Sequence, residues 1–489
     1  MLAGTFANPL YFFATNTSNV TQAEMWVRLP DILEFFFVAH PSSGRREGEE
    51  HQRIMYFYPK GETLDRQAEI TGFAEAVVNF TDNFVSPEEQ AQKPEFPFRT
   101  VSTQKSEHVY IQVENYVSIL VRFPAWNYQL SRTSRYSVFL AAIQNVLTNV
   151  YKMFRLFFGE FSPFSLDRPP FFPELYFYRK RNEQKFKERL EYFLGRYLPL
   201  LKLHRMPLLD YLNGAAFLPL NGPTYLNVVS MTSELVEEFP LIQKVLILYQ
   251  DKVLYYSLSR RDLPSLFRYL TQSLLPMTIG DELLHFKFRS SQGRFLRGPT
   301  DLTIDAPLAG DDALPTVHLF NSDDDEDNEE LIKYQMMVYR CLNATVCMFT
   351  NQEVTRKLLR NIDGYLGSEL SKVASQIGDC IGAQNPDVLS TPDFHYIYFN
   401  PASLSLTSSF TESADTPKPA LPPPEVSRLV CSSLTSFLSD ADEFGECFSK
   451  SESDWLSDGL LALSNGSLAD VQSRTLGIIK THFEAIFLN

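Results

Sequence analysis

Cysteine and histidine are the residue types in this chain best suited to bind a metal or to act as nucleophiles. The chain has eight histidines, and its five cysteines are Cys341, Cys347, Cys380, Cys431 and Cys447. No two cysteines have C-x-x-C spacing, and the histidines form neither an HExxH pair nor a cluster with ligand-like spacing. An odd number of scattered cysteines is typical of reduced, buried thiols in a cytosolic protein. The sequence therefore predicts no metal site.

The densest group of carboxylates is the run NSDDDEDNEE at residues 321–330. Carboxylate oxygens are good calcium ligands, so a calcium loop is one reading of this run. The run has no glycine for the sharp turn in the middle of an EF-hand loop, and its ligand spacing does not fit one. A solvated, mobile acidic loop is therefore the favoured interpretation.

Local signatures of common enzyme classes are absent from the sequence. It has no GxxxxGK[ST] phosphate loop, no GxGxxG fingerprint after a strand, no GxSxG elbow and no kinase motif set. Many active sites have no local signature, so an unrecognised hydrolase stays open as an alternative. We expect an interaction protein that is not an enzyme by itself, and we predict no catalytic residue and no cofactor.

The charge balance restricts the class of partner. Asp and Glu number 59 against 44 Lys and Arg, which gives a formal net charge of −15. Such a charge argues against nucleic-acid binding, which needs a positive field. The basic segment RKRNEQKFKER (179–189) could contact anionic lipid or an acidic partner, although a solvated helix face is the more common reading.

No segment reads as a membrane span or a signal peptide. The uncharged run 136–151 is shorter than the roughly 20 apolar residues that a span needs. A second uncharged run, 211–233, is interrupted by Pro219 and Pro223. The first basic residue is Arg28, so a signal peptide would lack its basic start. We expect a soluble, cytoplasmic chain whose contact with membranes is peripheral.

The N-terminal third of the chain combines apolar runs of strand length with two helical patterns. Apolar runs of strand length (33–39, 54–59, 98–104, 108–113 and 116–123) alternate with two helical patterns, the first around residues 70–84 and the second over 131–158. The first helix carries Ile70, Phe73, Val77, Phe80 and Phe84 at three- and four-residue spacing. The element order is ββαβββα. Both faces of the first hairpin are apolar, which predicts a sheet with helices on both faces.

The same order recurs further along the chain. Strand candidates at 244–250, 253–259, 286–288, 317–320, 334–342 and 344–350, a helix near 263–274 and a helix over 352–381 form a second copy. A third, weaker copy has strands at 394–400 and 403–410, a helix at 426–438, short strands within 446–464 and a closing helix at 467–487. Internal repetition of this kind predicts several domains of one type.

These patterns divide the chain into an arm, three domains and a connector. The expected boundaries are an irregular arm at 1–27, a first domain at 28–160, a helical connector at 161–240, a second domain at 241–385 with the acidic insert 321–330, and a third domain at 390–489 with a Pro-rich insert at 411–425.

A five-stranded antiparallel sheet in the order ββαβββα resembles the longin fold of membrane-traffic proteins. The run GRREGEE (44–50), followed by IMYFYPKG (54–61) and FAEAVVNF (73–80), is similar to the first longin domain of vacuolar fusion proteins of the Ccz type. FLPLNGPTYL (217–226), YQDKVLYYSL (249–258), RDLPSLFRYLTQSLLP (261–276) and DFHYIYFN (393–400) resemble the same family in the same order. The resemblance implies an α/β (α+β) fold of three longin domains, each a five-stranded antiparallel sheet flanked by helices on both faces.

The resemblance also implies a role in membrane traffic. Proteins of the Ccz type pair with a Mon-type tri-longin partner to form the guanine-nucleotide exchange factor of the late-endosomal Rab, Rab seven. A third regulatory subunit joins them in animals. The expected activity serves endosome maturation, vesicle fusion with the lysosome or vacuole, and autophagy, with peripheral recruitment to late-endosomal and lysosomal membranes. A longin subunit of a Hermansky–Pudlak type exchange complex is the alternative, because it shares part of the first-domain motif.

In this family the first longin domains form the Rab-binding platform. We therefore expect partner or Rab contacts on the exposed side of helix 70–84, on the turn 44–50 and on strand 98–104, with Arg45, Arg46 and Glu47 as candidate contact residues. An ordinary solvated turn explains these three residues equally well. By contrast, we expect Phe73, Phe80, Phe139 and Leu147 to lie in the core, because they occupy the apolar positions of the two helices.

Overall fold

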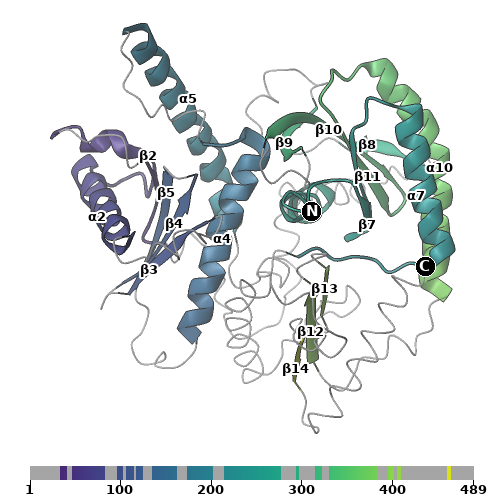
Figure 1. Cartoon of the computed structure of the whole chain (residues 1–489), viewed down its shortest axis with the longest axis horizontal. Coiled ribbons are helices and arrows are strands. Elements are labelled where there is room, and N and C mark those ends of the chain that lie inside the picture. The colour runs from purple at the N-terminus through teal and green to yellow at the C-terminus, as the bar shows by residue number, and fades with distance from the viewer. Residues whose placement is uncertain are drawn as a thin grey trace, which may run out of the picture. The chain divides into compact units, whose positions relative to one another are not determined.

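The computed structural model describes part of the chain and divides it into two compact units, mainly Glu24–Tyr211 and mainly Leu212–Thr300 with Ala309–Asn489. The described residues are 33–40, 47–82, 96–102, 106–114, 117–124, 135–161, 173–201, 214–276, 293–296, 314–321, 330–383, 395–400, 405–408 and 460–463 (Figure 1). The expected arm 1–27 and most of the two expected inserts lie outside them.

The first unit contains the predicted ββαβββα order. Its five strands are β1 (Phe35–Ala39), β2 (Ile54–Tyr58), β3 (Phe98–Ser102), β4 (Ser106–Val113) and β5 (Val117–Pro124). They form one antiparallel sheet in the order β2-β1-β5-β4-β3. Its helices are η2 (Glu50–Arg53), α2 (Leu64–Asp82), α4 (Arg135–Phe158), α5 (Pro173–Tyr197) and η4 (Leu198–Leu200).

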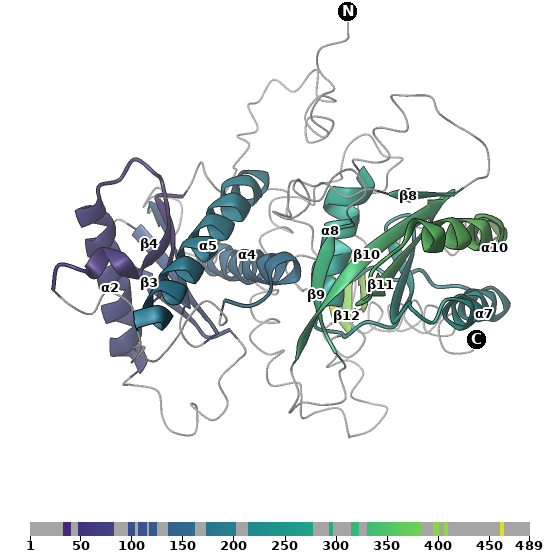
Figure 2. The same cartoon turned by 90° about the horizontal axis from the view of Figure 1, so that it is seen from above.

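Helices cover both faces of this sheet, as the apolar hairpin predicts. All five residues of β1 are buried, so neither of its faces can meet water. On one face Phe35, Phe37 and Tyr110 pack with Ala74 of α2. Figure 2 shows the sheet between α2 and the pair α4–α5.

Helix α5 adds an aromatic layer to α4. The Phe154 ring of α4 lies 5.5 Å from that of Phe193 and 6.2 Å from that of Phe186, both on α5. Leu147 is fully buried, as expected, whereas the side chain of Phe139 lies outside the described residues. Part of the range expected as a connector is therefore part of the core of the first unit.

The turn between β4 and β5 is attached to the end of α4 by Glu114. This residue has a positive φ of 49°. Its carboxylate accepts hydrogen bonds from the Tyr151 hydroxyl and from the Phe161 N–H, the latter at 2.7 Å. Burial, followed by the charge of Glu114, raises the pKa of Tyr151 above its usual range. The tyrosine therefore stays protonated and donates this bond at any physiological pH.

The second unit repeats the order with an extended sheet edge. Its strands are β6 (Lys244–Tyr249), β7 (Lys252–Tyr256), β8 (Arg294–Leu296), β9 (Thr316–Phe320), β10 (Leu331–Cys341) and β11 (Ala344–Thr350). The sheet order is β7-β6-β11-β10, and the outer side of β10 pairs with β9 along one half and with β8 along the other. Strand β8 was not predicted, and the expected strand 286–288 lies outside the described residues.

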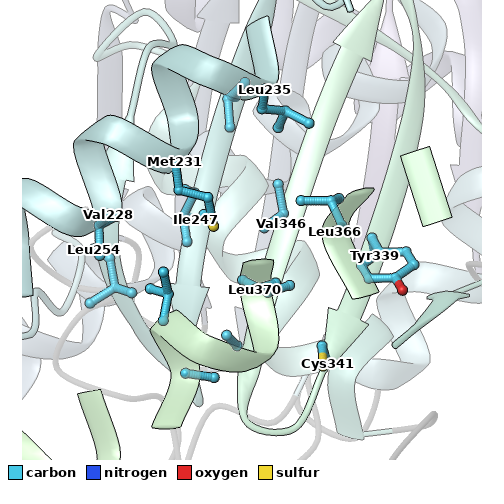
Figure 3. Packing of buried hydrophobic residues seen from close by; sticks show 14 of the residues in the cluster. Val228, Met231, Leu235, Ile247, Leu254, Tyr339, Cys341, Val346, Leu366 and Leu370 are labelled. Atoms are coloured by element: carbon cyan, nitrogen blue, oxygen red, sulfur yellow. The ribbon is translucent and has the colours of Figure 1, made fainter. Parts of the chain in front are cut away.

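Three helices sandwich the second sheet. Helix α8 (Leu263–Tyr269) and its π-helical continuation η6 (Leu270–Leu274) lie on one face, with α7 (Gly222–Glu238) and α10 (Arg356–Ala383) on the other (Figure 2). Val228, Met231 and Leu235 of α7 point toward the sheet beside Leu366 and Leu370 of α10 (Figure 3). Helix α7, which the sequence placed in the connector, thus packs on the second sheet.

The acidic insert connects the paired strands β9 and β10, and a backbone hydrogen bond joins its first and last residues. The Asn321 N–H donates to the Glu330 carbonyl at 3.2 Å. The Asn321 carbonyl accepts a 2.6 Å bond from Lys244 Nζ. The preceding Phe320 N–H donates to the buried Asp262 carboxylate at 2.7 Å. Both ends of the insert are thus held at the β9–β10 edge.

A third sheet has three strands within the described residues. These are β12 (His395–Asn400), β13 (Ser405–Ser408) and β14 (Leu460–Leu463), in the antiparallel order β13-β12-β14. The predicted hairpin is confirmed, and β14 falls within the range 446–464 where short strands were expected. The Pro-rich insert 411–425 and the helices expected at 426–438 and 467–487 lie outside the described residues. A complete third domain stays a prediction.

The substitution Leu366→Ala should strongly destabilise the second unit. Leu366 of α10 is fully buried in the core of the second unit. Truncating such a side chain costs about 2–5 kcal/mol in transfer and cavity free energy. Urea unfolding followed by fluorescence measures the loss. The matched control is the exposed Lys357 of the same helix, where alanine should change stability by less than about 0.5 kcal/mol. Equal midpoints for the two variants would contradict the packing.

Candidate docking surface

Helix α2 is buried along one side and carries exposed aromatic rings along another. Thr71 and Ala74 are buried against the sheet. Phe73 and Phe80 occupy the other side, where they are 51% and 64% exposed. The expectation that these two phenylalanines belong to the core is therefore wrong. Their seven-residue separation, two helical turns, places both on a single stripe that faces outward.

The exposed stripe lies toward the outer part of the sheet. The Phe73 ring lies 6.0 Å from the ring of His108 on β4. Near the end of α2, the Arg99 Nε of β3 donates to the Thr81 hydroxyl at 3.2 Å. The aromatic stripe of α2 thus runs beside the strands that end the sheet. We call Phe73, Phe80 and strand β3 the docking surface.

Strand β3 is an open edge of the first sheet. Among the described residues it pairs with β4 alone, through the register from Phe98↔Ile111 to Ser102↔Glu107. Its outer backbone groups can therefore pair with a strand of another chain. The side chain of Phe98 is exposed but alternates with that of Arg99, so it points to the face away from α2.

The turn before β2 lies on the other flank of α2. Arg53, the last residue of η2, forms a 2.7 Å ion pair with Glu75. Both side chains are largely shielded from water, so screening weakens the pair only in part. Glu75 and Phe73 project from nearly opposite sides of the helix. The turn, the helix and β3 are thus neighbours, with α2 between the other two.

Within the turn, Glu47 is exposed and Gly48 has a φ of 85°. The Gly48 N–H donates to the Glu50 carboxylate at 3.1 Å. The N–H groups of Glu50 itself and of Gly48 lower the pKa of that carboxyl. Arg45 and Arg46 lie outside the described residues, so the contact role of all three candidate residues stays a prediction.

The corresponding helix of the second unit offers no such stripe. Its apolar residues Leu263, Leu266 and Phe267 are buried. Arg268 and Tyr269, which point elsewhere around the helix, are buried as well. In the described part of the chain, an exposed aromatic stripe on the first helix is thus a feature of the first unit. Sequence periodicity did not separate the two helices, because both carry apolar residues at helical spacing.

The described residues hold no group of three or more His, Cys, Asp or Glu side chains arranged to bind a metal ion. None of the described helices is long and apolar enough to cross a membrane. The candidate site of the first unit is therefore the docking surface, which exposes the rings of Phe73 and Phe80 and the outer backbone groups of β3.

Comparison with known proteins agrees with this architecture. Residues 33–159 match a family model described as the first longin domain of INTU, CCZ1 and HPS4, and residues 242–367 match one described as Intu longin-like domain 2. A relative named "Vacuolar fusion protein CCZ1 homolog" from Nematostella vectensis is 29% identical over 92% of this chain and 97% of its own length. Its namesake from Xenopus laevis is 27% identical over 94% of this chain and 97% of its own.

The chain is thus similar over nearly its whole length to CCZ1 homologues, and it contains two domains that match longin family models. The first CCZ1-type longin domain contains the whole docking surface, because the matched range includes α2 and β3. The second matched range contains the second sheet and begins after α7. The predicted longin fold is confirmed for these two domains.

Substituting Phe80 by serine should barely change stability. The ring is largely exposed, and serine and phenylalanine have similar helix propensities, so the expected change is within about 0.5 kcal/mol. Leu147→Ala, in the core of the same domain, should cost about 2–5 kcal/mol. Urea unfolding compares the two. If Phe80→Ser lowered the free energy of unfolding as much as Leu147→Ala, Phe80 would have to be buried in the core.

Removing the charge of Glu75 should loosen the turn. Glu75→Gln weakens the charge-assisted bond to Arg53, which for a partly shielded pair is worth about 1 kcal/mol. Amide hydrogen exchange of residues 50–53 should accelerate about fivefold. Glu69→Gln is the control, because its pair with Arg66 is solvent-exposed and lies within α2. Unchanged exchange in Glu75→Gln would show that other contacts hold the turn.

Proposed function

We propose that this chain is the CCZ1-type subunit of a heteromeric guanine-nucleotide exchange factor that activates the late-endosomal Rab GTPase, Rab seven. The observation that supports this function most directly is the exposed aromatic stripe of α2 beside the open edge β3. Two rings of this size in water are unfavourable, since fully burying a phenylalanine side chain is worth about 1.5–3 kcal/mol. A second longin domain, supplied by a Mon-type tri-longin partner, would cover them.

The proposed activity needs a rigid surface and no reactive side chain. An exchange factor binds the nucleotide-free GTPase more tightly than the loaded form, and by reciprocity it weakens nucleotide binding by the same factor. Strands packed between helical layers resist deformation, because protein interiors are close-packed. In the proposed complex, α2 and β3 would contribute this surface, and the turn with Arg45, Arg46 and Glu47 would extend it along the opposite flank.

The names of the relatives support a role in membrane traffic for the proposed activity. The homologues from Nematostella vectensis and Xenopus laevis are called vacuolar fusion proteins. We infer roles in endosome maturation, fusion with the lysosome or vacuole, and autophagy. A third regulatory subunit and peripheral recruitment to late-endosomal membranes belong to the same proposal.

An exchange complex of the Hermansky–Pudlak type is the second candidate. The description of the first family model names HPS4 beside CCZ1, so the first domain alone does not discriminate between the two. The nearly full-length similarity to CCZ1 homologues favours the first candidate. The preferred Rab of the assembled complex distinguishes them.

The exchange assay uses the full chain co-purified with its Mon-type partner. Rab seven loaded with fluorescent GDP should release its nucleotide faster in the presence of the complex. The double substitution Phe73→Ser and Phe80→Ser should lower the rate at least about tenfold, because interface energy concentrates in buried aromatic anchors. Co-purification of the partner, measured in the same preparation, should fall with it.

The control for this assay is Leu342→Asn. Leu342 is 50% exposed in the turn between β10 and β11 of the second unit, and has a positive φ that asparagine tolerates. It should leave exchange unchanged. A wild-type complex that fails to accelerate GDP release from Rab seven would refute the proposal, and acceleration confined to Rabs of lysosome-related organelles would favour the Hermansky–Pudlak type instead.

A further inference from the structure

Helix α7 presents a second exposed apolar surface, in the second longin domain. Its inner side is buried on the sheet through Val228, Met231 and Leu235 (Figure 3). On its outer side Leu226 is 63% exposed and Val236 is 38% exposed. These two side chains do not contribute to the core of the domain.

The exposed apolar residues follow one side of the helix. Leu226, Val229, Ser233 and Val236 are spaced by three, four and three residues, so they form a single row. Val229 is half-buried, and Ser233 is exposed between the two ends. The row is about 15 Å long at 1.5 Å per residue. We call these four residues the α7 stripe.

The helix that bears the α7 stripe is held firmly at both ends. Its N-terminus is capped by the Asn221 side chain, which accepts from the Thr224 N–H at 3.0 Å. Asn227 donates to Gln376 of α10 at 3.0 Å. Further along, the Tyr365 hydroxyl donates to the Glu234 carboxylate at 3.3 Å. The stripe is thus presented on a fixed support, which lowers the entropic cost of binding.

The charges around the stripe are predominantly negative. Helix α7 contains no Lys or Arg, and Glu234, Glu237 and Glu238 are exposed along its C-terminal half. On the row of α10 that faces α7, Lys372 pairs with Glu369 at 2.8 Å. A ligand that covers the stripe therefore gains from positive charge at its margins.

From this combination we propose that the α7 stripe is the docking site for a cationic amphipathic helix of a partner protein. Apolar side chains of that helix, at three- and four-residue spacing, cover Leu226, Val229 and Val236. Its Lys or Arg residues face Glu237, which flanks the row beside Ser233. The occupant is not an anionic membrane, because the exposed glutamates of α7 repel acidic headgroups. This site does not depend on the exchange activity proposed for the first domain.

The test uses the full chain and a synthetic helical peptide of leucine and lysine, with leucines at three- and four-residue spacing. Fluorescence anisotropy should detect its binding. Leu226→Ser combined with Val236→Ser should weaken binding at least about tenfold. A peptide of the same composition in shuffled order should bind about tenfold more weakly than the patterned one. Glu237→Gln combined with Glu238→Gln should weaken binding and reduce its salt dependence.

The matched control is Leu342→Asn, which removes a similarly exposed leucine from the turn between β10 and β11, outside α7, and should leave peptide affinity within about twofold. If a serine variant unfolds, hydrogen exchange of the wild-type chain replaces it, with slower exchange in residues 222–238 expected on peptide addition. Equal binding by wild type and the serine variant, or equal loss in Leu342→Asn, would overturn the site.

Two further results would overturn the assigned occupant. One is a dimer of the chain, seen by sedimentation, that the serine substitutions dissociate, because the stripe would then take a second copy. The other is binding of phosphatidylserine vesicles that depends on Leu226. Nucleotide release in the exchange assay is measured separately, so failure of either proposal is recognised independently of the other.

Discussion

The architecture depends on strands that are buried on both faces. Every residue of β1 and of β6 is buried, so each strand needs a helical layer above it and another below. Aromatic and aliphatic side chains meet this requirement in the first domain through α2, α4 and α5, and in the second through α7, α8 and α10. Once these layers are in place, the outer sides of α2 and α7 keep exposed apolar side chains, which are available for binding.

Much of the fold could be predicted from the sequence, because a strand buried on both faces appears there as a short run of apolar residues. The runs at 33–39 and 244–250 gave β1 and β6 almost residue by residue. Strand β8 escaped because three residues, Arg294–Leu296, carry too little periodicity to detect. Helix α2 begins at Leu64, earlier than expected, because its first turns are polar and charged. Both elements were missed in part because a short strand and a polar helical turn leave no apolar periodicity in the sequence.

The sequence singled out the exposed side of helix 70–84 and strand 98–104 as contact regions, which stays a prediction, whereas its assignment of Phe73 and Phe80 to the core was wrong. A three- and four-residue spacing selects one side of α2 that includes Phe73 and Phe80, yet Thr71 and Ala74 define another side with the same period. Small residues suit the side that approaches the sheet closely, and large rings are left outside. A single sequence has no information on which side meets the strands, because that choice belongs to the tertiary fold. The contact role of Glu47 is untested for a different reason, since exposure alone does not identify a contact.

The open edge β3 has a consequence for the biosynthesis of this chain. In the second domain the outer side of β10 is covered by two short strands from separate segments, β8 and β9. Strand β3 has no such cover among the described residues and lies beside exposed rings. Left uncovered, this edge offers a strand of another protein a template for cross-strand aggregation. A partner that covers β3, as proposed above, would therefore also protect the newly made chain from aggregation.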